Sequence, residues 1–257
     1  MEGIGRRYML VAGLLLASCA RAYGPPFFTD DPVPVDFRHW EVYIATQYLH
    51  ARDGVEGTAP HFEVNYGAAP NVQVHIITPF AYSTSPGSAN QWGYGDTELG
   101  VKYRFVQESK DMPQIGVFPL VEIPTGDSSR GLGSGQASFF IPVWMQKSWG
   151  SWSSYWGGGF WHNPGQGNRD HWFFGWQAQR QMTQSLALGA EIFYQTADTD
   201  DGQNHTGFNV GAVYDFDEGH HLMLSLGSDI HGPNLGTMYL AYQWTFGPKE
   251  KKAQSAP

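Results

Sequence analysis

The chain has 257 residues, of which 15% are charged and 15% are aromatic, and 32 are glycines. A soluble domain usually carries about a quarter charged residues, so this composition favours sheet surfaces that do not all face water. The mean hydropathy of -0.36 excludes a bundle of membrane helices, because each helix needs roughly 18 or more consecutive apolar residues. The formal net charge of -9 argues against nucleic acid as a partner. A soluble all-β sandwich or barrel would share many of these features.

The N-terminus has the three parts of a secretory signal peptide. Arg6 and Arg7 form a positive start, residues 8–17 form a short apolar stretch, and Ala20-Arg21-Ala22 fits the cleavage pattern. The stretch is too short to span a membrane as a helix, so we expect residues 1–22 to be removed.

The single cysteine, Cys19, leaves a second route open. Cleavage after Ala22 would remove it and leave a mature chain that cannot form a disulfide. However, the sequence from Leu16 to Cys19 also resembles a lipoprotein cleavage box, which would leave a lipidated Cys19 at the new N-terminus. Both routes lead to the cell envelope. A proline-rich segment, residues 23–37, follows, and it is predicted to line, plug or lead into a barrel.

From Arg38 onward, apolar and polar residues alternate along the chain. Between residues 94 and 106 one face is apolar, whereas the other carries Asp96, Glu98, Gly100, Lys102 and Arg104. Period-two alternation is typical of strands with unlike faces, and a small or polar second face suits the lumen of a barrel. We therefore predict an all-β fold, a transmembrane antiparallel β-barrel of about 12 strands over residues 38–246, followed by a polar tail, 247–257. The predicted strands are 38–49, 60–68, 71–83, 94–106, 114–123, 136–147, 151–162, 171–182, 185–195, 205–216, 221–230 and 235–246.

The predicted connections alternate between two kinds. Short turns on one side and longer loops on the other are typical of outer-membrane barrels. The end of the last predicted strand, residues 239–246, has aromatic residues at alternate positions, which resembles the C-terminal signal of bacterial outer-membrane proteins. The longer, glycine- and aspartate-rich loops are predicted at 50–59, 84–93, 124–135, 163–170 and 196–204, with a short member at 231–234.

Three motifs resemble a bacterial family of outer-membrane transporters linked to the meta-pathway of phenol degradation (the MetA-pathway family). They are residues 25–32 with Arg38-His39-Trp40-Glu41, residues 93–104, and residues 119–126 with the following glycine loop. The resemblance spans most of the mature chain. It implies an outer-membrane barrel associated with uptake of small, often aromatic or hydrophobic compounds, and it brings no catalytic residues.

Several charged residues fall on the face predicted to line the lumen. Buried charges are costly unless they are paired or hydrated, so they would either brace the interior as ion pairs or line a narrow wet path. Twelve strands lie between the filled eight-strand barrel and the open sixteen-strand channel, so the sequence leaves both readings open. The candidates are Glu63, Glu98, Lys102, Arg104, Glu122, Glu191 and Asp215.

Other motifs carry weaker hypotheses. The acidic loop 198–201 could hold calcium, but a solvated loop is the better interpretation. His220 and His221 are adjacent in a predicted turn, where two imidazoles chelate a metal ion poorly. His205 could serve a lipid hydrolase, yet it lacks a nearby serine motif. Five tryptophans form either a membrane girdle or a solute-stacking surface: Trp152, Trp156, Trp161, Trp172 and Trp176.

The sequence therefore predicts a porin-like transporter of the bacterial outer membrane, not an enzyme, without metal or cofactor. Its expected partners are the lipid bilayer and a small hydrophobic or aromatic solute. A non-transporting structural barrel is the alternative, and an outer-membrane lipid hydrolase is a weaker one.

Overall fold

The computed structural model describes residues 25–52 and 54–248. The predicted signal peptide with Cys19 and most of the polar tail lie outside these residues. Strands make up most of the described chain, which has one short 3-10 helix, η1 (Ser128–Arg130). The strands are β1 (Trp40–Ala51), β2 (Gly54–Ala69), β3 (Val72–Thr84), β4 (Gln91–Tyr94), β5 (Thr97–Val106), β6 (Gln114–Val117), β7 (Leu120–Ile123), β8 (Ser138–Trp149), β9 (Trp152–His162), β10 (His171–Gln181), β11 (Leu186–Gln195), β12 (His205–Asp217), β13 (His220–His231) and β14 (Gly236–Phe246).

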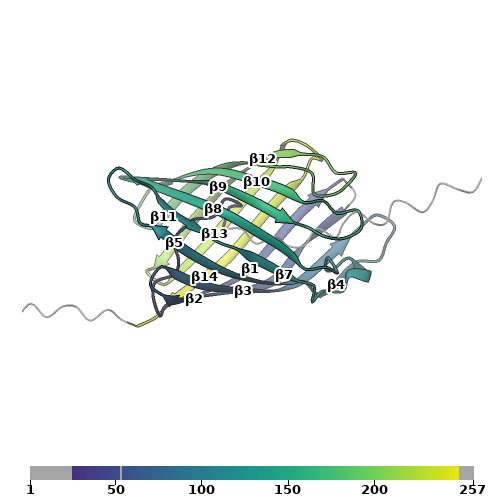
Figure 1. Cartoon of the computed structure of the whole chain (residues 1–257), viewed down its shortest axis with the longest axis horizontal. Helices are drawn as coiled ribbons and strands as arrows, with labels where there is room; N and C mark the ends of the chain where they lie inside the picture. Colours follow the sequence, from purple (N-terminus) through teal and green to yellow (C-terminus); the bar gives the residue numbers. More distant parts are fainter. Residues whose placement is uncertain (1–24, 53, 249–257) are drawn as a thin grey trace, which may run out of the picture.

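These strands form one closed antiparallel barrel. The first strand pairs with the last from Trp40↔Phe246 to His50↔Gly236, so no edge is left open. Figure 1 shows this closure, with yellow β14 beside β1. β4 and β5 both pair with β3, and β6 and β7 both pair with β5 and β8, so each pair acts as a single interrupted strand. The prediction of a 12-strand barrel is confirmed.

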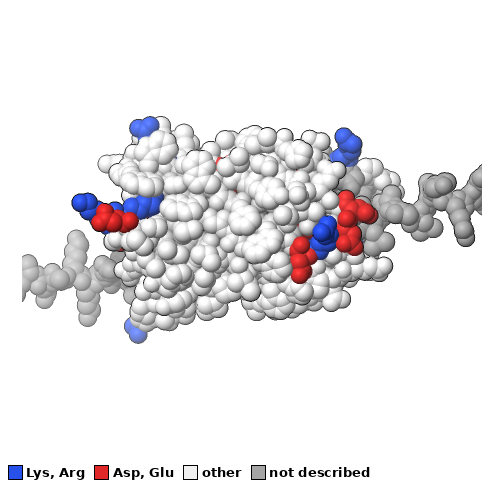
Figure 2. Space-filling view, turned by 45° about the horizontal axis from the view of Figure 1, so that its top comes forward, with Lys and Arg blue, Asp and Glu red and all other residues white. Residues whose placement is uncertain are grey.

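The outer face carries the apolar side chains of the alternation. Ile44, Ile141 and Val210 are more than half exposed although they are apolar, as lipid-facing positions require. Figure 2 shows Lys, Arg, Asp and Glu gathered at the two ends of this face, with an uncharged band between them. None of the residues in the described ranges forms a helix long and apolar enough to cross a membrane.

The connections define two ends of the barrel. The short-turn end carries residues 70–71, 107–113, 150–151, 182–185 and 218–219, and the long-loop end carries the β1–β2 connection and residues 85–90, 124–137, 163–170, 196–204 and 232–235. Because periplasmic turns are the short ones in such barrels, we assign the short-turn end, where β1 begins and β14 ends, to the periplasm.

The predicted loop 50–59 is wrong. β1 continues to Ala51 and β2 begins at Gly54, so a tight hairpin replaces the loop. Gly54 and Gly57 gave this stretch the composition of a loop. The barrel accommodates Pro60 at a point where the β2–β3 register shifts, between Thr58 and His61, so the missing backbone donor costs no ladder hydrogen bond.

A charge placed on the lipid-facing band tests the membrane orientation of this wall. Ile141 is 63% exposed on β8. Replacing it by arginine (Ile141→Arg) is expected to lower the free energy of unfolding in lipid vesicles by about 2–4 kcal/mol, because the guanidinium must enter hydrocarbon. Trp149→Arg at the end of β8 is the control and should cost about 1 kcal/mol or less. Equal costs in urea unfolding would contradict the assignment of the band.

Candidate functional site

The proline-rich segment occupies the lumen. We call residues 25–37 the N-terminal plug. Phe27, Thr29 and Asp30 are at most 4% exposed, and Pro25 and Pro26 line a cavity in the long-loop half of the barrel. At its other end, Arg38 N donates to Gly67 O near the short-turn end. The plug therefore extends from the short-turn end into the long-loop half of the barrel interior, and of the predicted roles it plugs the barrel.

One carboxylate holds the middle of the plug. The backbone N–H groups of Phe28 and Thr29 donate to the two Glu191 oxygens at 2.8 Å each. Asn209 Nδ2 donates to the same carboxylate at 2.6 Å. Ser225 Oγ donates to the carbonyl of Pro26, and the Phe28 ring meets Phe193 edge-on at a centroid distance of 4.8 Å. Side chains of the wall thus provide hydrogen-bond partners for the backbone of the plug, which strand pairing does not satisfy here.

An ion pair joins the plug to the opposite wall. Lys102 Nζ on β5 lies 3.1 Å from Asp30 Oδ1 and 3.7 Å from Asp31 Oδ1. Lys102 is 5% exposed and Asp30 is 4% exposed. The same ammonium lies 4.8 Å from the centre of the Phe118 ring. Because water is nearly excluded here, each charge depends on its partner.

Glycines on the inner wall make room for the plug. A Cβ atom at Gly189 or Gly211 would lie 3.0 Å or 2.9 Å from the Phe27 ring, closer than real side chains come. The ring therefore rests directly on the backbones of β11 and β12. Small residues on the polar face of these strands thus have a packing role, which alternation alone could not show.

Beside the plug, a polar network links the first strands. Asn65 Nδ2 donates to Glu63 at 2.8 Å, and Gln73 Nε2 donates to Asn65 Oδ1 at 2.9 Å. The ring of His75 lies between Asn65 Oδ1 at 2.6 Å and Glu98 Oε1 at 2.8 Å. On the other side of the barrel interior, aromatic residues pack together, with the Phe140 and Trp161 rings stacked at 4.7 Å. Phe140 and Trp161 lie toward the long-loop end, whereas the polar network fills the lumen beside the plug toward the short-turn end.

The seven predicted lumen residues all fall at inward strand positions, but they do not form one site. Glu63, Glu98, Lys102, Glu122 and Glu191 are at most 5% exposed. Glu63 and Glu98 belong to the polar network, Lys102 and Glu191 hold the plug, and Glu122 accepts a hydrogen bond from Ser138 Oγ at 2.7 Å. Their role in lining a solute path stays a prediction.

The other two, Arg104 and Asp215, are half-buried toward the short-turn end. Arg104 donates to Asn71 Oδ1 and Gln114 Oε1. His221 Nδ1 lies 2.6 Å from Asp215 Oδ1. Arg104 and Asp215 therefore stabilise the short-turn end of the barrel and, among the described residues, make no contact in the middle of the lumen.

A cavity of about 330 Å³ lies between the plug and the long-loop end. The loop 124–137 folds toward it, so that Leu132 is 4% exposed and lines the cavity. Asp96 holds this loop by accepting hydrogen bonds from Gly126 N at 2.8 Å and Ser134 N at 2.6 Å. The aromatic lining consists of Phe27, Phe28, Tyr48, Tyr82, Phe173, Phe193 and Tyr239.

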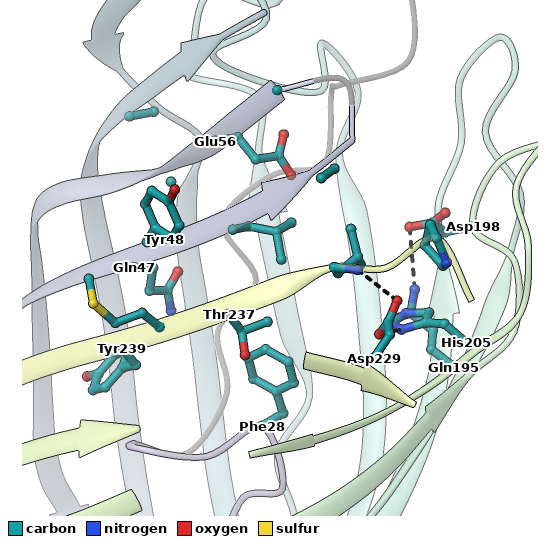
Figure 3. Close-up of a pocket in the computed structure, with 18 of the residues that line it drawn as sticks. Phe28, Gln47, Tyr48, Glu56, Gln195, Asp198, His205, Asp229, Thr237 and Tyr239 are labelled. Atoms are coloured by element: carbon teal, nitrogen blue, oxygen red, sulfur yellow. Dashed lines mark hydrogen bonds and ion pairs between the residues drawn. The ribbon is translucent and has the colours of Figure 1, made fainter. Parts of the chain in front are cut away.

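Polar side chains gather on one wall of the cavity, formed by β11, β12 and β13. His205 donates from Nδ1 to Asp229 Oδ1 at 3.0 Å, and Leu235 N donates to the other oxygen of Asp229 at 3.0 Å. Gln195 and Asp198 lie beside them, with Phe28 and Thr237 toward the plug (Figure 3). His205 therefore bonds an aspartate through Nδ1, and among the described residues no hydrogen bond is found between it and a serine.

The structure places the histidines and tryptophans singled out in the sequence in different surroundings. His220 bonds to the Tyr242 hydroxyl, and His221 bonds to Asp215. Within residues 25–52 and 54–248, no three His, Cys, Asp or Glu side chains are grouped to hold a metal ion. Four of the five tryptophans lie on the outer face, but Trp161 is 2% exposed and points inward, so grouping it with them was wrong.

Sequence reasoning missed the cavity and the groups that hold the plug. Asp30 was noticed only as part of a proline-rich stretch, and His75 was not singled out. The alternation of the strand could have identified His75, because this residue occupies one of its inward-facing positions. No local signal pairs Asp30 with Lys102, since they are 72 residues apart.

Solved structures with a similar fold are outer-membrane barrels. An outer-membrane channel of the COG4313 group from Pseudomonas putida F1 aligns with a TM-score of 0.72 at 13% identity, covering 88% of this chain and all of the other. The KdgM porin aligns with a TM-score of 0.56 at 12% identity over 79% of this chain and 99% of the other. The translocator domain of the autotransporter NalP from Neisseria meningitidis gives 0.56 at 11% identity over 82% and 90%. At these identities the likeness concerns the fold.

A search among curated proteins finds no match. A family model described as "Putative MetA-pathway of phenol degradation" matches residues 39–246, which is nearly the whole barrel. The match agrees with the sequence motifs and with the closed 12-strand fold. The chain therefore belongs to this family, and its fold is that of the outer-membrane β-barrels.

Proposed function

We propose that this protein lets small hydrophobic or aromatic solutes pass passively across the outer membrane. The cavity at the long-loop end is where such a solute first binds, and the N-terminal plug is the closed gate beneath it. The observation that carries this proposal is the aromatic cavity itself, which remains in a barrel whose other half is filled. A volume of about 330 Å³ suits one substituted aromatic ring, and sites for small molecules are mostly apolar with a few placed polar groups.

The filled half of the lumen favours a second candidate, a structural barrel that transports nothing. Glu191, Lys102 and the polar network would then serve only to brace the wall. The two candidates differ in what the cavity does, because a structural barrel has no need to bind a solute reversibly.

Filling the cavity tests the proposal. Leu49 lines it from β1, whereas Leu240 on β14 is 39% exposed on the outer face. Leu49→Trp is expected to weaken the binding of 2-phenylethanol by at least about tenfold, because the indole takes the space of the ligand ring. Leu240→Trp, the matched control, should leave the affinity unchanged. Calorimetry on the full protein in lipid nanodiscs, with empty nanodiscs subtracted, measures this. No saturable binding by the unsubstituted protein would contradict the proposal.

A further inference from the structure

A groove of about 480 Å³ crosses the outer face of β8, β9 and β10 near the short-turn end. Four tryptophans form its rim: Trp149, Trp152, Trp156 and Trp176. Trp149, Trp152 and Trp176 are about half exposed, so the groove faces lipid and not the lumen. Aromatic girdles are common at the membrane boundary of such barrels, but a hollow between the rings can hold one particular molecule.

Small side chains form the floor of this outer groove. Ser154 on β9 pairs with Ala178 on β10, midway along β9 between Trp152 and Trp156. Because these two tryptophans are four residues apart, their Cα atoms stand about 13 Å from each other along the strand. The floor between them therefore leaves room for the glycerol backbone of a lipid and the start of an acyl chain.

Hydrogen bonds within the wall hold the rim of the outer groove in place. The Nε1 atom of Trp176 donates to Ser154 Oγ at 3.0 Å, and Ser154 Oγ donates to the carbonyl of Gln177 at 3.1 Å. Tryptophans at a membrane boundary usually turn their N–H group toward the headgroups, whereas Trp176 uses it on the wall. Its ring is thus fixed beside the groove, so a bound molecule has little side-chain freedom to remove.

A cation lies at the edge of the outer groove that is nearest the short turns. Arg180 is exposed next to the last residue of β10, and its guanidinium lies 5.4 Å from the centre of the Trp152 ring. Among the described residues, no carboxylate forms an ion pair with Arg180. A guanidinium group matches the oxygens of a phosphate with two parallel N–H groups, so this edge suits a phosphate group.

We propose that the outer groove binds one phospholipid of the periplasmic leaflet, with its phosphate on Arg180 and the start of one acyl chain over Ser154 and Ala178. The order of groups along the wall matches that of such a lipid, because the cation lies nearest the periplasm and the apolar rings extend away from it. Basic side chains at this level of a membrane protein attract lipid headgroups. The groove shares no lining residue with the solute cavity, so the lipid site is separate from the proposed passage of solutes.

Lipid binding by the full protein tests the proposal. Native mass spectrometry from detergent micelles measures the affinity for the first bound copy of dioleoyl-phosphatidylglycerol and of dioleoylglycerol, which has the same chains but no phosphate. We expect the phospholipid to bind first as a single tight copy. The diacylglycerol should bind about fivefold more weakly, since one basic side chain near a headgroup contributes about this factor.

A charge variant assigns the phosphate to Arg180. Arg180→Gln should weaken the binding of phosphatidylglycerol about fivefold and leave that of the diacylglycerol unchanged, because only the contact with the phosphate is lost. Arg38→Gln is the matched control, since Arg38 is also exposed at the short-turn end and lies 4.9 Å from the centre of an aromatic ring, that of Phe37. This control should change neither affinity.

A second pair of variants assigns the acyl chain to the floor. Ala178→Phe fills the outer groove and should weaken the binding of both lipids at least about fivefold. Ala212→Phe is the control, because Ala212 lies between the exposed residues Val210 and Tyr214 on the outer face of β12, outside the groove. It should weaken the binding of neither lipid.

Three results would overturn the proposal. Equal affinities of the unsubstituted protein for the two lipids would show that no phosphate is recognised. An equal loss of both lipids in Arg180→Gln would mean that Arg180 only packs against Trp152. Equal losses in Ala178→Phe and Ala212→Phe would mean that lipids cover the outer face without a particular site.

Discussion

Deleting residues 25–35 is expected to open the barrel. In the full chain these residues occupy the lumen, where Glu191 and Lys102 hold them. A barrel of twelve strands is wider than the eight-strand barrels that side chains alone can fill, so removing the segment leaves a continuous water path. We expect the mean conductance in planar bilayers to rise by at least about tenfold, with stepwise openings.

The chain offers a control of equal length. Deleting residues 247–257 removes as many residues from the other end, beyond the last residue of β14, Phe246. This variant should conduct as little as the full protein. If the deletion of residues 25–35 is equally silent although the refolded barrel is intact by circular dichroism, then the plug is not what closes the lumen.

The substitution Lys102→Met should be one of the most destabilising single changes in the interior. It removes the ammonium 3.1 Å from Asp30 Oδ1 and leaves that carboxylate buried. Losing one member of a buried ion pair typically costs about 3–5 kcal/mol, and we expect this decrease in the free energy of unfolding. Urea titration of the protein in lipid vesicles measures it.

A double variant shows whether the cost comes from the unpaired charge. In Asp30→Asn combined with Lys102→Met no charge remains buried at this contact, so more than half of the lost stability should return. Glu108 and Lys147 form a pair near the short-turn end, 3.3 Å apart, in which Glu108 is 25% exposed. Lys147→Met should cost about 1 kcal/mol or less there. A double variant as unstable as the sum of both single ones would contradict the explanation.

Much of the barrel could be predicted from the sequence because it depends on local alternation. Residues 94–106 alternate so regularly that both faces were assigned, and β5 begins within three residues of that prediction. The interruption between Tyr94 and Thr97 was missed, because Gly95 and Asp96 continue the alternation although the strand breaks there. The reverse error occurred at 50–59, where two glycines give real strand residues the composition of a loop.

The candidate site could be predicted only as a set of inward positions. Which inward side chains meet depends on contacts between residues far apart in the chain, such as Glu191 with Phe28, separated by 163 positions. The plug adds a layer that strand periodicity cannot describe, because it has no strand partner along most of its length. The cavity in turn is lined by the plug together with strands that are far apart in the chain, so no local pattern could locate it.

The most direct test of the account is uptake across an intact outer membrane. The measurement is the initial rate at which Gram-negative cells take up radiolabelled 2-phenylethanol when this protein is their sole aromatic channel, with Leu49→Trp and Leu240→Trp at matched surface levels. The account predicts that Leu49→Trp lowers uptake to the rate of cells without the protein, whereas Leu240→Trp does not. Equal uptake by both variants would contradict passage through the cavity.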